Sequence, residues 1–265
     1  MAHSGETYAV VLALLFAVAA GLVGSFALMK RMLLASDVIS HVALPGLGVA
    51  FLFGFNPMIG GAATLFLGTL LIWQLQKKTG LATEAMIGVV FAGSVAIGAV
   101  LTPKEDLVEA LFGRFQDLSL SAFLLGVGAV LVVILVVFRF KDELILGLFA
   151  PELAAATGVK LERLNLYFLL VFSLSVLVGL RFLGALLAGA LIIIPAITGR
   201  RLTSDLSHFL VVSCLASVAA VGSGFAVTHY LRPQFSPGPV IVIISAGLFI
   251  LSLLKRPVSA DQRRN

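Results

Sequence analysis

Charged residues are scarce in this chain. Only 12% of its 265 residues are Asp, Glu, Lys or Arg, whereas hydrophobic residues make up 60%. The charged fraction is about half of the ~25% that is typical of soluble domains. A soluble protein of this length has too little interior to hide so much apolar side chain. The composition therefore excludes a soluble globular enzyme and a disordered chain, and it indicates a helical membrane protein with several spans.

Several chemical signatures are also missing from the sequence. The one cysteine, Cys214, has no second cysteine with which to form an internal disulfide. A phosphate-binding loop of the form GxxxxGK followed by Ser or Thr does not occur, so any use of ATP requires a partner chain. No HExxH motif and no nucleophile arrangement are present, which argues against an enzyme. The basic residues are not interleaved with aromatics, so the net charge of +5 does not indicate nucleic acid binding.

Nine apolar runs are long enough to cross much or all of a bilayer, which takes ~20 residues. The stretch from Leu164 to Gly199 is too long for one span, and Arg181 with Gly184 divides it into two spans or a span plus a broken helix. We therefore expect an all-α polytopic protein with eight or nine transmembrane helices, in a single domain over 1–265. The runs lie at about 7–29, 33–54, 57–75, 84–102, 119–138, 164–181, 183–199, 208–230 and 238–254.

Lysine and arginine gather on one side of these spans. If Lys30 and Arg31 are cytoplasmic and the spans alternate, 14 of the 18 basic residues lie on the cytoplasmic side. Cytoplasmic loops carry the excess of Lys and Arg in membrane proteins. Nine spans then predict an external N-terminus and a cytoplasmic C-terminus. The segment before the first run has no Lys or Arg, so we interpret that run as a retained helix and not as a signal peptide.

Two connections between the predicted spans are long. The outer loop, 103–118, is locally acidic. The inner loop, 139–163, contains the sequence PELAAATG, with Pro151 at a first helical position, Glu152 in the first turn and Gly158 as a stop. This pattern predicts a short helix on the cytoplasmic face, either a docking element for a partner or a solvated connector.

The most informative polar residues inside a predicted span are Asp37 and His41. Their i, i+4 spacing places both on one face of a helix, about one turn apart. A carboxylate and an imidazole can together bind a divalent transition metal, and Ser40 lies beside them to orient either one. Pro45 and Gly46 follow directly and predict a bent helix, because proline frees a backbone carbonyl within a span.

Other roles for this pair remain open at the level of sequence. Asp37 and His41 could bond to each other, Asp37 could cap a helix near the membrane surface, or the two could relay protons. Two ligands are also few for a metal site, since zinc is usually four-coordinate. A two-fold dimer with this helix on its axis would supply four ligands.

The remaining polar residues predict less. Glu84 begins a span, His208 and His229 flank another, and Arg181 ends a third, so all four are expected at membrane interfaces.

The segment GLVGSFALMKRMLLASDVISHVALPGLGVAFLFG resembles the second-helix signature of the ABC-3 family, the zinc/manganese/iron ABC importer permeases. Further segments match in order: MIGVVFAGSVAIGAVL, Leu111-Phe112-Gly113, FLGALLAGALIIIPAITGRRL with Pro195, at which we expect a second kink, and the late SPGPVIVI. The resemblance covers most of the chain, and the second-helix and PAITGRR motifs are its most specific parts.

This resemblance implies the metal-chelate type of ABC importer permease fold in a multi-pass protein of a prokaryotic plasma membrane. It implies a homodimer that works with two cytoplasmic ATP-binding subunits and an extracytoplasmic metal-binding protein, surrounded by lipid. The cargo would be Zn²⁺, Mn²⁺ or Fe²⁺, with no permanently bound cofactor. A proton-coupled secondary metal transporter is the alternative function.

The resemblance also assigns residues to roles. The family's metal-binding Asp and His fall on Asp37 and His41, and its ATPase-coupling segment falls on Phe149 to Gly158, including Pro151 and Glu152. The chain departs from the family at Ser36, where Gly is usual, and at Ala150, where Asp is usual. The second departure removes a charge or a helix cap from the expected docking surface.

Overall fold

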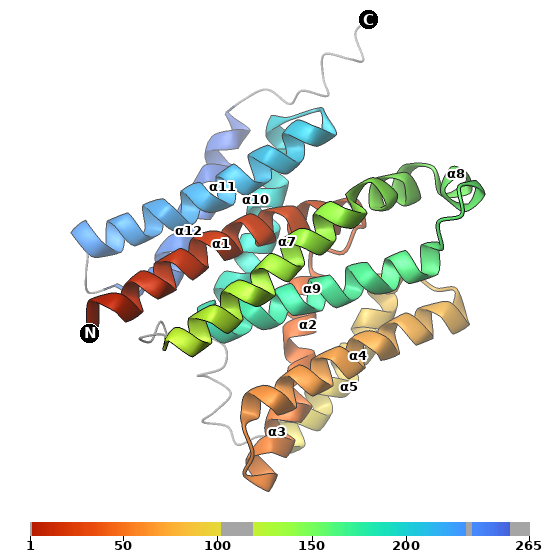
Figure 1. Ribbon diagram of the computed structural model, residues 1–265, viewed down its shortest axis with the longest axis horizontal. Coiled ribbons are helices and arrows are strands. Elements are labelled where there is room, and N and C mark those ends of the chain that lie inside the picture. Colours follow the sequence, from red (N-terminus) through yellow and green to blue (C-terminus); the bar gives the residue numbers. More distant parts are fainter. Residues whose placement is uncertain (1, 102–118, 232–234, 255–265) are drawn as a thin grey trace, which may run out of the picture.

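A computed structural model describes residues 2–101, 119–231 and 235–254, and all of its regular secondary structure in these ranges is helical. Seven helices of the described residues are long and apolar enough to cross a membrane. The N-terminal half of the bundle is built from α1 (Ala2–Met29), the broken helix α2 (Ala35–Ser40), η1 (His41–Ala43) and α3 (Leu44–Phe53), then α4 (Pro57–Thr79) and α5 (Thr83–Leu101). Figure 1 shows α3, α4 and α5 gathered at one end of the molecule.

The C-terminal half contains α7 (Leu120–Phe149), the short α8 (Pro151–Ala156), α9 (Leu161–Leu183) and α10 (Ala185–Leu202). It ends with α11 (Leu206–Ala226), its π-helical extension η2 (Val227–Leu231) and α12 (Pro237–Leu253). The helices coincide with the nine predicted apolar runs. The division of the long stretch 164–199 is confirmed, because α9 ends at Leu183 and Gly184 takes a positive φ of 85° before α10 begins.

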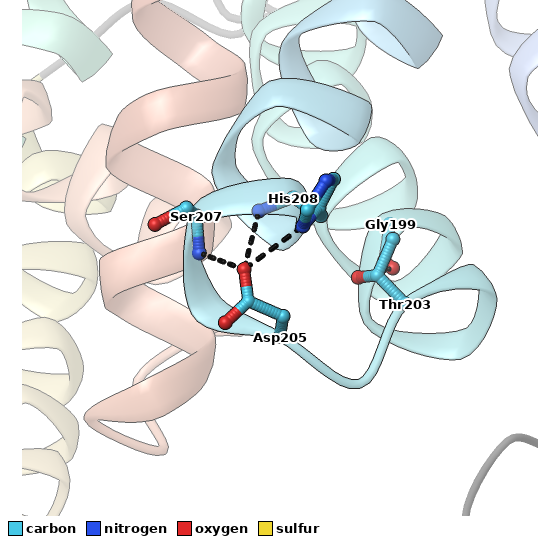
Figure 2. Close-up of polar contacts among 5 residues, drawn as sticks. All are labelled: Gly199, Thr203, Asp205, Ser207 and His208. Atoms are coloured by element: carbon cyan, nitrogen blue, oxygen red, sulfur yellow. Dashed lines mark hydrogen bonds and ion pairs between the residues drawn. The ribbon is translucent and has the colours of Figure 1, made fainter.

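Local sequence sets several of the helix ends. Asn56 accepts a hydrogen bond from the Met58 amide at 2.9 Å and precedes Pro57 at the start of α4, and Gly80 ends that helix in the left-handed region. At the start of α11, one carboxylate oxygen of Asp205 accepts bonds from the amides of Ser207 and His208 and contacts the His208 ring nitrogen at 2.9 Å (Figure 2). These bonds, the His208 side-chain bond first, hold the pKa of Asp205 below its ordinary range.

The core lies around α1, which packs against α11, α10, α7 and α9. Phe16 and Phe26 of α1 and Phe172 of α9 are fully buried there. Glycine permits the close approach: a Cβ at Gly24 would overlap the carbonyl oxygen of Ile192 in α10. Small residues at such crossings are the usual means by which helices pack in lipid.

The predicted inner loop 139–163 is mostly helical, so the expectation that a loop begins at residue 139 is wrong. The helix α7 continues to Phe149, and the connector between α7 and α9 consists of α8 with its short flanks. Arg139 and Glu143 form an i, i+4 ion pair at 3.7 Å in this extension. Such pairs stabilise an exposed helix, so the helix continues through its charged residues. At 30 residues, α7 is about 45 Å long, well over the ~30 Å hydrocarbon core.

The connection between α1 and α2 is recessed relative to the ends of its neighbours. In Figure 1 the ends of α7 and α9 beside α8, and the end of α4 on the same side of the molecule, project past the point where α1 ends. Lys30, the first residue after α1, accordingly lines a cavity together with Gln76 near the end of α4, Leu148 near the end of α7 and Asn165 near the start of α9. The segment that leads into Asp37 therefore dips into the protein on the side predicted to be cytoplasmic.

Candidate functional site

The segment with Asp37 and His41 is a helix that changes type within one turn. Asp37 lies in the first turn of α2, where a carboxylate is favoured by the helix dipole, and His41 begins the 3₁₀ turn η1. In a regular helix the amide of residue 45 would donate to the His41 carbonyl, but Pro45 has no N–H. The Leu44 amide donates to that carbonyl in its place. The interruption thus lies between His41 and Pro45, where the sequence predicts a bend.

Gly46 brings the second part of this broken helix against α4. A Cβ at Gly46 would overlap the carbonyl oxygen of Gly60, and the converse holds for a Cβ at Gly60. Thr64 of α4 donates its hydroxyl to the carbonyl of Ala43 at 3.3 Å, which satisfies a backbone acceptor at the interruption. The bend is therefore held from outside by α4.

The side chains of Asp37 and His41 are not committed to one another. In the described ranges there is neither a hydrogen bond nor an ion pair between them, and the Asp37 carboxylate accepts none. The cap position of α2 is Leu34, so Asp37 is not the cap. The Ser40 hydroxyl donates to the backbone carbonyl of Asp37 at 2.6 Å, so it does not orient either side chain.

The surroundings of the pair are apolar and partly open. Asp37 is exposed and His41 is half-buried, with its ring edge-on to Phe91 of α5 at 5.7 Å between centroids. Within the described part of the chain, no three His, Cys, Asp or Glu residues lie close enough to hold a metal ion together. The described residues of one chain thus offer a carboxylate and an imidazole without a third such ligand beside them.

The segment 149–158 contains the short helix that its sequence predicts. Pro151 and Glu152 occupy the first turn of α8, and Gly158 follows with a φ of 84°. Ala150 precedes the helix without a side-chain cap, as expected where the family's usual Asp is absent. Phe149 at the end of α7 and Leu153 of α8 are 70% and 55% exposed, so the junction of α7 and α8 presents apolar surface to the outside.

Pro195 lies inside α10, which continues without interruption from Ala185 to Leu202. The Thr198 hydroxyl donates at 2.8 Å to the carbonyl of Ile194, one turn earlier in the helix. Glu84 is exposed in the first turn of α5, and Arg181 is exposed at the end of α9, over the Phe182 ring. The acidic outer loop 103–118 and the Leu111-Phe112-Gly113 motif lie outside the described residues.

One polar cluster was not predicted from the sequence. Lys30, Asn165 and Gln76 form a chain of hydrogen bonds at the recessed end of α1. Each lies among other polar residues at the end of an apolar run, which is where polar residues are expected in any span, so only the tertiary structure brings them together. Their position near Trp73, the single tryptophan, is the signal that could have drawn attention to this end of the bundle.

The family model described as the ABC 3 transport family matches residues 6–256, almost the whole chain. The chain belongs to this family. Its relatives include the manganese transport system membrane protein MntC of Halalkalibacterium halodurans, 29% identical over 263 residues that cover 97% of this chain and 89% of the relative. The zinc uptake system membrane protein ZnuB of Haemophilus influenzae is 27% identical over 240 residues, covering 88% and 90%. As a member of this family, the chain is a transport permease and not itself the ATPase.

Two solved structures share its fold. One is titled PsaBC from Streptococcus pneumoniae in complex with Fab, with a TM-score of 0.77 at 24% identity, covering 93% of this chain and 90% of that one. The other, an inward-facing conformation of a putative metal-chelate type ABC transporter, gives 0.73 at 18% identity, covering 94% and 85%. The expected metal-chelate type of permease fold is thereby confirmed.

Proposed function

We propose that this chain is the permease subunit of an ATP-driven importer for a divalent transition metal, namely zinc, manganese or iron. Two copies form the translocation path in a prokaryotic plasma membrane. Two cytoplasmic ATP-binding subunits supply energy, and an extracytoplasmic metal-binding protein delivers the ion. The names of the manganese and zinc relatives support the class of cargo.

The observation that carries the proposal is the uncommitted state of Asp37 and His41. Placing a carboxylate inside a membrane span costs free energy, so such a residue indicates a functional site. Among the described residues, the Asp37 carboxylate has no ion-pair or hydrogen-bond partner and does not cap the helix. The ion would exchange part of its water shell for these oxygen and nitrogen ligands, which lowers the cost of crossing an apolar slab.

A second copy supplies the missing ligands. A two-fold axis beside α2 would bring together two Asp37 and two His41, the four-ligand set that zinc prefers. The helix α5, which contacts α2 and η1, leaves a face of small residues uncovered beside this segment. Glycine and alanine on that face allow two helices to approach closely in lipid.

The helix α8 provides the mechanical link to the ATP-binding subunits. Backbone hydrogen bonds tie it to the chain on both sides: the Ala150 amide donates to the Leu146 carbonyl of α7, and the Val159 amide, on the way to α9, donates to the Ala154 carbonyl. Ala154 is fully buried against the bundle. A displacement of α8 by a partner would therefore move the ends of α7 and α9 and tilt the bundle around the metal site.

The test is uptake of Zn²⁺, Mn²⁺ and Fe²⁺ by cells carrying the complete system with Asp37→Asn or His41→Ala. Each change should reduce uptake by more than the roughly 10–100-fold that outer-shell changes cost at metal sites, because a direct ligand is lost. Glu84→Gln is the matched control, since its exposed carboxylate lies in the first turn of α5. Uptake that survives Asp37→Asn would refute the site.

The alternative, a proton-coupled secondary metal transporter, differs from an ATP-driven importer in its energy source. An ATP-driven importer stops when its ATP-binding subunit is deleted and continues while ATP lasts after the proton gradient collapses. A secondary transporter gives the opposite pair of results. The same uptake assay therefore distinguishes the two classes.

A further inference from the structure

A cavity of about 420 Å³ opens at the recessed end of α1, away from the Asp37 and His41 segment. Its floor is Lys30, and its walls come from the ends of α4 and α7 and from the start of α9. The last turns of α7 and the first turns of α9 are the two segments that carry α8 between them. The cavity therefore lies at the base of the proposed coupling element, and the function proposed above does not use it.

The floor of the cavity holds a cation without a counter-ion. The Lys30 ammonium donates to the Asn165 side-chain oxygen at 2.8 Å, and the Asn165 amide donates to the Gln76 side-chain oxygen at 2.6 Å. Both partners are neutral. The ammonium also lies 5.0 Å from the centroid of the Phe168 ring. Among the described residues, Lys30 has no carboxylate partner, and burial lowers its pKa to about 8.

The other charges that line the cavity neutralise one another. Lys77 and Glu162 form an ion pair at 2.7 Å. The Trp73 ring stands beside them, since its indole nitrogen donates to the Glu162 carbonyl at 3.0 Å and the Lys77 ammonium lies 5.7 Å from its centroid. The described lining thus has a net charge of +1, and that charge sits on Lys30.

The walls are apolar on one side. Leu144 and Leu148 of α7 line the cavity with Leu161 and Leu164 of α9. Tryptophan is enriched at the headgroup level of membranes, and basic pockets between helices on the cytoplasmic side receive acidic lipid headgroups. A lone cation, an indole and a leucine wall together match a ligand with one anionic group and an apolar portion.

We propose that this cavity binds the phosphate group of an anionic ligand, with Lys30 contacting the phosphate and the leucines contacting its apolar part. The phosphate can belong to the headgroup of an acidic phospholipid or to a soluble phosphate monoester, and the leucine wall favours the lipid. Such a ligand would bridge α1 to the stems of α8. It would add to the importer a site for lipid or metabolite that is separate from the metal path.

The test uses the purified full chain in detergent, where Trp73 is the single tryptophan and its fluorescence reports on the cavity. The probes are dihexanoyl phosphatidylglycerol, the zwitterionic dihexanoyl phosphatidylcholine and glycerol 3-phosphate. We expect a saturable change with phosphatidylglycerol and none that saturates with phosphatidylcholine. Lys30→Met should raise the half-saturating concentration by about tenfold or more, because a charge-assisted bond to phosphate is lost.

Two matched variants isolate the charge of Lys30. Lys30→Arg keeps a cation at the floor and should retain binding, and Lys78→Met removes an exposed cation outside the cavity and should leave the titration unchanged. If Lys30→Met does not fold, wild-type titrations in low salt and in about 0.5 M salt replace it, since screening should raise the half-saturating concentration.

The outcomes separate the sources of phosphate and can overturn the site. Saturation by phosphatidylglycerol alone assigns a lipid, and Lys30-dependent saturation by glycerol 3-phosphate as well assigns a soluble phosphate. Equal responses to the two lipids, no response to any probe, or a titration indifferent to both Lys30→Met and salt would overturn the proposal. None of these readouts depends on metal transport, so the result stands apart from the function proposed above.

Discussion

The helices α1 and α5 are nearly alike in composition and opposite in environment. Their most apolar windows have mean hydropathies of 2.5 and 2.0, yet 67% of the first window is buried inside the protein and only 28% of the second. Glycine shows the same contrast. A Cβ at Gly24 of α1 would overlap α10, whereas a Cβ at Gly93 of α5 would have no atom within 4 Å among the described residues.

This contrast shows why hydropathy does not report burial in a membrane protein. An apolar side chain is equally compatible with lipid and with protein, so the pattern that separates core from surface in soluble proteins is absent. What distinguishes the two helices is how many glycines are packed: Gly21 and Gly24 of α1 both meet neighbouring backbone, whereas in α5 only Gly98 is packed closely and Gly93 faces open space among the described residues. The uncovered face of α5 lies beside the only predicted metal ligands, and the covered face of α1 builds the scaffold.

The largest difference in stability is expected between alanine substitutions at Gly24 and at Gly93. Gly24→Ala should destabilise the protein by about 1–3 kcal/mol or more, because the added methyl group meets the Ile192 backbone and cannot be accommodated by a rotamer change. Gly93→Ala should leave the folded fraction unchanged or slightly raised, since alanine is the better helix former by up to ~1 kcal/mol. The measurement is the yield and thermal stability of monodisperse protein in detergent. Equal losses for both variants would contradict the contrast.

A second prediction concerns what covers α5. In a Cys214→Ser background, Gly93→Cys should give a disulfide-linked pair of chains on mild oxidation in membranes, because the proposed dimer packs this face against its copy. Gly128→Cys is the matched control, since Gly128 of α7 is also a glycine with open space around it. The readout is the non-reducing gel. Equal cross-linking at both positions would indicate random collision and would remove α5 from the dimer interface.

A third prediction concerns the titration of Lys30, which changes stability only across an alkaline pH window. Burial lowers its pKa to about 8, so at higher pH the unfolded chain holds this proton when the folded chain has released it. Unfolding then takes up a proton, and the free energy of unfolding should rise with pH across that window. The destabilisation due to Lys30 is complete below its folded pKa and fades as pH approaches the unfolded value.

The measurement compares denaturant unfolding of wild-type protein and Lys30→Met between about pH 7 and about pH 10. The wild type should gain stability relative to the variant as pH rises. The other titratable groups that line the cavity, Lys77 and Glu162, are paired with each other and are present in both proteins, so their titration cancels. A difference that stays constant with pH would show that Lys30 is not buried as described.

Much of the fold could be predicted because each membrane span corresponds to a continuous run of apolar residues. All nine apolar runs became helices, and the breaks at Gly184 and at Pro45 follow from the backbone requirements of glycine and proline. The end of α7 was predicted poorly. The helix α7 continues to Phe149 because an amphipathic helix extends into water without losing its hydrogen bonds, and hydropathy alone sees only where the lipid ends.

The candidate site divides in the same way. The spacing of Asp37 and His41 is local, so sequence predicts that they share a helix face. The lack of a bond between their side chains among the described residues, and the packing of α4 against Gly46, appear only in the tertiary structure. The Lys30 cluster was invisible for the same reason, since Asn165 lies 135 residues away along the chain.

By itself, the sequence determined that this protein is a bundle of membrane-spanning helices, where those helices lie, and which pair of residues is suited to a metal. Those features depend on composition and on spacing within one helix, which survive without neighbours. The tertiary structure decided which apolar faces are core and which are uncovered, that Asp37 is left unpaired among the described residues, and that Lys30 lies at the floor of a cavity. These depend on which helices meet, and in a chain whose spans are all apolar, only shape complementarity settles that.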